Sequence, residues 1–221
     1  MNDFEIWQRF SVFDRVHPQL QMTRQLFVPA IEPVGDLPYE LAGLLPNREH
    51  SRDLMVLIEA LPENSFGHRS VVGVFAADPF LNCKRVAVRL MAKGYDQVTN
   101  IPPAAGYGTE FLATLDKVAA GRAQEQRNIG QLVDRGLCVS PAVAAIECLP
   151  EALDGSPHRL WVVPSFDMWQ GEAIRKKLLL KLCRDVIHRT DVPVVLVTGH
   201  TSVTAAEAAQ AGAKGILVDG G

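Results

Sequence analysis

The chain has 221 residues, of which 48% are hydrophobic and 21% are charged. This length fits a single domain, and the composition is too apolar for a disordered chain. The formal charge of -3, without any basic tract, argues against a nucleic-acid-binding protein.

Neither a leader nor a membrane span is indicated. Residues 1–10 (MNDFEIWQRF) are acidic and amphipathic and lack the apolar run of a signal peptide. No apolar stretch approaches the roughly 20 residues that cross a bilayer. We therefore expect no membrane partner.

Residues 1–24 are predicted to form an N-terminal amphipathic helical segment, ahead of a single domain over 25–221. Within that domain, short runs rich in Val, Ile and Leu recur. They are apolar on both faces, as strands of a parallel sheet are. Seven strands are predicted, over 25–31, 71–76, 97–101, 137–143, 160–164, 194–198 and 215–218.

Segments with helical spacing lie between these strands. Residues 51–61 could be a strand, but Leu54, Leu57, Ile58 and Leu61 share one helical face, and Ser51 can cap, so we predict a helix. A second helix is predicted to begin near Phe80, where an apolar stripe runs over 80–91, and a similar stripe favours a helix over 174–186. A capping box at Thr204–Glu207 starts the last one, and Gly94, Gly136 and Gly212 are predicted to end helices.

Alternating strands and helices predict an α/β fold with a parallel sheet. A TIM-barrel-like domain fits best, and a doubly wound open sheet is the alternative. Because only about seven strands are predicted and Gly221 follows the last of them, we expect a shortened or incomplete barrel whose closing helix is missing.

In either architecture, ligands bind at the carboxyl ends of the strands. Asp78 stands at such an end, where it can be a metal ligand or general base, or simply the cap of the helix that follows Pro79. Asn100 ends the next strand, where its amide can hold an enolate or carbonyl oxygen or satisfy a loop.

A second group of candidates follows the late strands. Gly199, His200, Thr201 and Ser202 lead into an alanine-rich helix, whose N-terminus is a ready anion site, unless these residues only cap it. His200 can transfer a proton or polarise an oxygen. The backbone of Gly220, near the chain end, can add an anion-binding N–H group.

Cysteine and glycine usage exclude two classes of site. The cysteines are scattered, without any Cys-x-x-Cys pair, which argues against a disulfide framework or structural zinc and suits a reducing cytoplasm. Gly106-x-Gly108 lacks the third glycine of a dinucleotide fingerprint, so no nucleotide cofactor is expected.

Four short motifs, in order, carry a family resemblance: LAGLLP (41–46), GVFAADPF (73–80), GYDQVTNIPPAAGYG (94–108) and RGLCVSPAV (135–143). They resemble the phosphoenolpyruvate hydrolase-like TIM-barrel proteins, also called TIM-barrel signal transduction proteins. The match is best over 41–143. Later loops, such as SFDMWQGE (165–172), depart from the family pattern.

The resemblance implies an enzyme acting on a small phosphorylated, phosphonylated or carboxylated 2-oxo acid, with Mg²⁺ as a candidate cofactor. In this hypothesis Asp78 is the base or metal ligand, Asn100 binds the oxyanion, and His200 is the acid or electrophile. Gly199, Thr201, Ser202 and Gly220 bind the anion.

The alternative hypothesis is a non-catalytic binding or regulatory protein on a degenerate barrel. It is motivated by the shortened N-terminal region, the missing last helix and the diverged late loops. Because an open barrel would expose apolar strand surface, we also expect a homo-oligomer.

Overall fold

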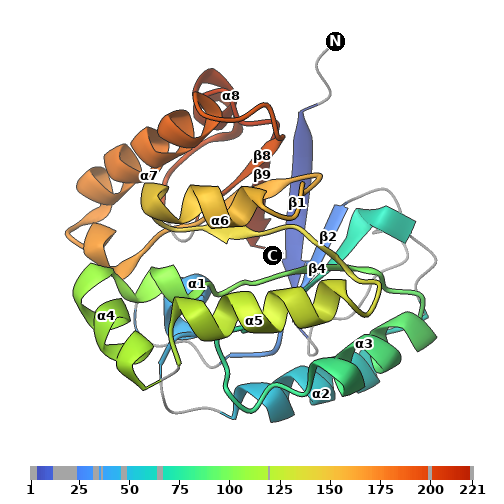
Figure 1. The fold of residues 1–221 in the computed structure, drawn as a ribbon. Helices are drawn as coiled ribbons and strands as arrows, with labels where there is room; N and C mark the ends of the chain where they lie inside the picture. The colour runs from blue at the N-terminus through green and yellow to red at the C-terminus, as the bar shows by residue number, and fades with distance from the viewer. Residues whose placement is uncertain are drawn as a thin grey trace.

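The protein is described by a computed structural model over residues 4–11, 24–31, 35, 37–45, 49–63, 67–118, 120–198 and 201–219. Nine parallel strand segments form one curled sheet surrounded by helices (Figure 1). The strands are β1 (Glu5–Phe10), β2 (Arg24–Phe27), β3 (Ser70–Gly73), β4 (Gln97–Thr99), β5 (Cys138–Val139), β6 (Ala142–Val143), β7 (Leu160–Val162), β8 (Val194–Val197) and β9 (Gly215–Asp219).

The strand order is β5-β4-β3-β2-β1-β9-β8-β7-β6, so the sheet begins and ends in one segment of the chain. Only Ser140 and Pro141 separate β5 from β6. The first half of this segment pairs with β4 and the second half pairs with β7. The series of strand pairings therefore returns to its starting segment, and the predicted TIM-barrel-like fold is confirmed.

The helices lie outside this ring of strands (Figure 1). They are α1 (Tyr39–Ala42), α2 (His50–Ala60), α3 (Cys83–Ala92), α4 (Thr109–Lys117), α5 (Arg122–Val133), α6 (Leu149–Leu153), α7 (Glu172–Ile187) and α8 (Ala205–Gln210). Short 3₁₀ turns are η2 (Gly67–Arg69), η3 (Ala104–Tyr107), η4 (Ile146–Cys148) and η5 (Phe166–Met168). Within the described part of the chain no helix follows β9, and none is long and apolar enough to cross a membrane.

All seven predicted strands and the helix predicted over 51–61 are present. Gly94, Gly136 and Gly212 adopt the positive φ angles expected of residues that end helices. The capping box of Thr204 and Glu207 is also confirmed.

Three predictions were wrong in detail. Residues 5–10, taken as part of a helical segment, form strand β1, while 12–23 lie outside the described residues. The second helix begins at Cys83, not near Phe80, and its cap is Asn82, whose Oδ1 accepts the Arg85 N–H at 2.9 Å. Ser51 does not cap α2.

Strand β1 (EIWQRF) was not predicted because it mixes charged and polar residues with apolar ones, and its charged residues find partners elsewhere in the fold. Glu5 forms an ion pair with Arg24 at 2.7 Å and faces Arg159 at 3.5 Å. Arg9 forms an ion pair with Glu40, which is fully buried. Without knowledge of these ion-pair partners, the local sequence of β1 was interpreted as part of an amphipathic surface helix.

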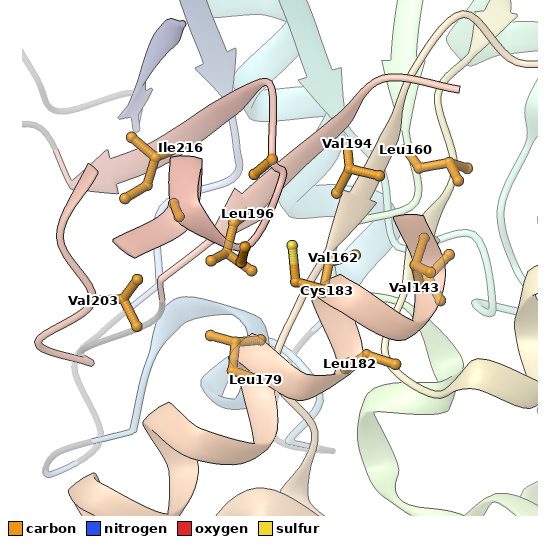
Figure 2. Close-up of a cluster of buried hydrophobic side chains, with 14 of the residues drawn as sticks. Val143, Leu160, Val162, Leu179, Leu182, Cys183, Val194, Leu196, Val203 and Ile216 are labelled. Carbon is orange, nitrogen blue, oxygen red and sulfur yellow. The ribbon is translucent and has the colours of Figure 1, made fainter. Parts of the chain in front are cut away.

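Three buried clusters hold the layers together. One fills the ring of strands, where Trp7 and Trp161 meet edge to face with their ring centroids 4.9 Å apart. A second packs α2, α3 and α5 on β2 to β4. The third, shown in Figure 2, packs Leu179, Leu182 and Cys183 of α7 against side chains of β7, β8 and β9. Burial of these apolar surfaces supplies the main stabilisation of the fold.

Candidate functional site

A hollow opens at the carboxyl ends of β2, β3 and β4, where a parallel barrel places its ligands. Its cavity volume is about 10 Å³, room for about one water molecule, and the surrounding empty space of about 290 Å³ includes open solvent. The wall contributed by the strand ends is apolar and consists of Pro29, Ile31, Phe75, Ile101 and Pro102. We call this the mouth hollow.

The polar residues that line the mouth hollow are Tyr39 of α1 and His50 and Asp53 of α2. The His50 ring lies over Phe75 with a centroid separation of 4.3 Å. A mostly apolar wall with a few polar groups is typical of small-molecule sites. His50 and Asp53 stand three residues apart on α2, and an imidazole and a carboxylate are groups that can transfer protons to or from a ligand.

Asp78 does not line this hollow and hydrogen-bonds to groups of its own chain. Its side chain accepts hydrogen bonds from Ser51 Oγ at 2.5 Å and from the Phe80 N–H at 2.8 Å, and the residue is 7% exposed. Because Ser51 follows His50 directly, the carboxylate fixes the first turn of α2, which carries the polar wall. Asp78 is therefore a turn-forming residue that contacts α2 through Ser51, and its catalytic role stays a prediction.

Asn100 is buried within a polar network and does not point to open space. Its Oδ1 accepts the Ala142 N–H at 2.7 Å, and its side chain also hydrogen-bonds Glu125. Glu125 in turn accepts the Ala104 N–H at 2.9 Å. The side chain thus joins the end of β4 to β6 and α5, and its predicted contact with an oxyanion is untested.

Glu125 is the member of this network that the sequence reading missed. Burial raises its pKa from 4.5 to about 7, against the opposing effect of the hydrogen bonds from Asn100 and Ala104 and of the charge of Arg122. Its burial could have been predicted only from the spacing of residues in α5, because Glu125 stands on the same helical face as the buried Asn128 and Leu132.

The late-strand candidates are only partly described. Thr201 donates its hydroxyl and its N–H to the Thr198 carbonyl, at 2.7 and 3.1 Å. Ser202 is exposed, and its carbonyl accepts a hydrogen bond from Lys176 Nζ at 3.2 Å. Gly199, His200 and Gly220 lie outside the described residues.

The described residues do not fit a protein-held Mg²⁺ site. Both oxygens of Asp78 already accept hydrogen bonds. Within the ranges that the structure describes, no group of three or more His, Cys, Asp or Glu side chains could hold a metal ion. We therefore derive no chemical step through a metal.

The cysteines are all free, as the sequence predicted. Burial raises the pKa of Cys148 to about 11 and that of Cys183 to about 12, and it also raises that of Cys83. These three thiols therefore stay protonated at neutral pH, which argues against any of them as a nucleophile.

Comparison with known proteins shows the fold. No family model matches the chain, and no curated protein matches it either. The fold is similar to tryptophan synthase from M. tuberculosis, with 17% identity, a TM-score of 0.57 and coverage of 99% of this chain and 83% of that one. It is also similar to tryptophan synthase from Pyrococcus furiosus, with 13% identity, a TM-score of 0.59 and coverage of 99% and 88%. At these identities the likeness establishes a TIM-barrel-like architecture.

Proposed function

We propose that the chain is an enzyme of the TIM-barrel type that acts on a small phosphorylated, phosphonylated or carboxylated 2-oxo acid. The observation that carries the proposal is the mouth hollow, whose apolar wall faces the polar pair His50 and Asp53. The motif resemblance over 41–143 supports the class of substrate.

In this proposal the first turn of α2 supplies the chemistry. His50 transfers a proton to or from the carbon next to the 2-oxo group, and Asp53 orients the imidazole or the substrate. The apolar wall excludes water from the reacting carbon. Asp78 is a positioning residue that acts through Ser51, which refines the catalytic role expected from the sequence.

The test starts with a panel of phosphonates, enol phosphates and 2-oxo acids, screened by thermal shift with and without Mg²⁺. Each hit is then assayed for turnover. We expect His50→Gln to abolish turnover and Asp78→Asn to reduce it. His188→Gln is the matched control, because this exposed histidine lies at the far end of α7. Turnover that survives His50→Gln refutes the assigned chemistry.

A second candidate function is binding or regulation without turnover. It is favoured by the internal partners of Asp78 and Asn100, whose polar atoms serve the turn after β3 and the joint between β4 and β6. Binding of a panel member without any turnover would support this candidate.

A further inference from the structure

Arg175 is a buried cation on the packing face of α7. The residue is only 8% exposed, although arginine seldom lies on the buried face of an amphipathic helix. It stands one turn before Leu179, which packs against the sheet in Figure 2. The helix therefore directs a guanidinium toward the protein, where aliphatic side chains occupy the following turns.

No carboxylate accompanies this charge among the described residues. The guanidinium lies over the Trp169 ring, 3.8 Å from its centroid, and Nε is buried without a hydrogen-bond partner. A buried guanidinium normally forms an ion pair, because transfer of an unpaired charge out of water is costly. Stacking on an indole fixes the plane of the group but gives the Nε–H donor no acceptor.

Two acidic residues precede Arg175: Glu172 is exposed in the first turn of α7, and Asp167 in the preceding loop is engaged elsewhere. Asp167, in η5, accepts hydrogen bonds from the Thr109 N–H at 3.0 Å and from Thr109 Oγ1 at 3.3 Å. It thereby caps α4. The next cation along α7, Lys176, has an acidic partner of its own in Glu207, at 2.7 Å.

The backbone at the N-terminus of α7 adds a second source of positive potential, which the exposed Glu172 carboxylate in the same turn partly offsets. This helix has 16 residues, and its N-cap, Gly171, provides no side-chain cap. A Cβ placed on Gly171 would meet no atom within 4 Å, so there is open space beside the cap. The unpaired N–H groups of a first helical turn attract anions.

We propose that Arg175, Trp169 and the first turn of α7 form a binding subsite for a small oxyanion, a phosphate or carboxylate group. The guanidinium supplies paired N–H donors, and the helix N-terminus supplies backbone donors. The subsite follows β7, at the same carboxyl end of the barrel as the mouth hollow. It goes beyond the proposed function, because anion binding here requires no turnover.

The test measures binding of inorganic phosphate and of oxalate to the full chain by isothermal titration calorimetry. We expect Arg175→Gln to weaken binding of the preferred anion about tenfold or more, the size of a lost charge-assisted hydrogen bond. Lys177→Gln removes the same charge from an exposed position two residues away and should leave the affinity within about twofold. The anion that binds more tightly identifies the ligand group.

Thermal unfolding distinguishes the loss of an anion site from misfolding of the variant. Since the substitution removes an unpaired buried charge, Arg175→Met should unfold at the same or a higher temperature than the wild type in anion-free buffer. Saturating phosphate or oxalate should then raise the wild-type midpoint but not the variant's. Equal anion affinity in wild type and Arg175→Gln, or no binding of either anion by the wild type, overturns the proposal.

Discussion

The buried carboxyl of Glu125 makes the stability of the fold depend on pH in an unusual direction. Its pKa is raised to about 7 in the folded chain, chiefly by burial, against 4.5 for an ordinary glutamate. Below about pH 4.5, folded and unfolded chains both keep the proton. As the pH rises toward 7, the unfolded chain loses the proton first, so the free energy of unfolding falls and then levels off.

The size of this effect follows from the same two pKa values. A difference between 4.5 and about 7 corresponds to about 3 kcal/mol, at roughly 1.4 kcal/mol per pH unit. Glu125→Gln removes the titrating group and keeps its volume. We therefore expect the unfolding free energy of the wild type, relative to this variant, to fall by about 3 kcal/mol between pH 4.5 and 7.

Urea denaturation of both proteins at several pH values between 4.5 and 8 measures this difference. Glu110→Gln, at an exposed position of α4, is the control and should show no such trend. The amide that Glu125→Gln introduces cannot reproduce the hydrogen bonds to both Asn100 and Ala104, so only the change with pH is diagnostic. A difference between wild type and Glu125→Gln that stays constant over this range would refute the reasoning.

Two further predictions concern the α2–α3 side of the barrel. Asn82→Ala should cost about 1 kcal/mol in unfolding free energy, because it removes the cap of α3, and an unchanged urea midpoint would contradict this. The expected homo-oligomer can be tested by light scattering at micromolar concentration. Exposed apolar side chains stand on the neighbouring helices α2, α3 and α5. If the oligomer forms through them, Met91→Lys should dissociate it. A wild-type protein that is monomeric at this concentration would contradict the predicted homo-oligomer. These side chains are Val56, Val88, Met91 and Val133.

The fold was largely predictable because a parallel barrel leaves a strong pattern. Its strands are buried on both faces, so β3 (SVVG) and β8 (VVLV) read as apolar runs. The strand β1 was not predictable in this way, because Glu5 and Arg9 find their partners on β2, α1 and the segment before β7. Ion pairs between residues so far apart in the sequence cannot be predicted from a local sequence pattern.

The sequence predicted an edge of the sheet for the candidate site, and that prediction stays open. Asp78 stands after β3 as expected, but it does not line the mouth hollow. His50 and Asp53 were missed because they sit on a helix rather than at a strand end. Asn100 followed a strand as expected, yet its side chain is used by Glu125 and the Ala142 N–H. The position of a residue at the end of a strand does not predict whether its polar side chain hydrogen-bonds within the protein or faces a ligand.

The two proposals together separate an enzyme from a binding protein on this barrel. A 2-oxo acid with a phosphate, phosphonate or carboxylate group needs a cationic contact for its anionic end and a proton donor for its reacting carbon. Arg175 meets the first requirement and His50 the second, and they lie on opposite arcs of the strand order, after β7 and between β2 and β3. If one substrate uses both, Arg175→Gln must weaken binding while His50→Gln must slow turnover at saturation. If only the anion site functions, His50→Gln will leave the anion affinity unchanged and no turnover will be found with either protein, which supports the binding function.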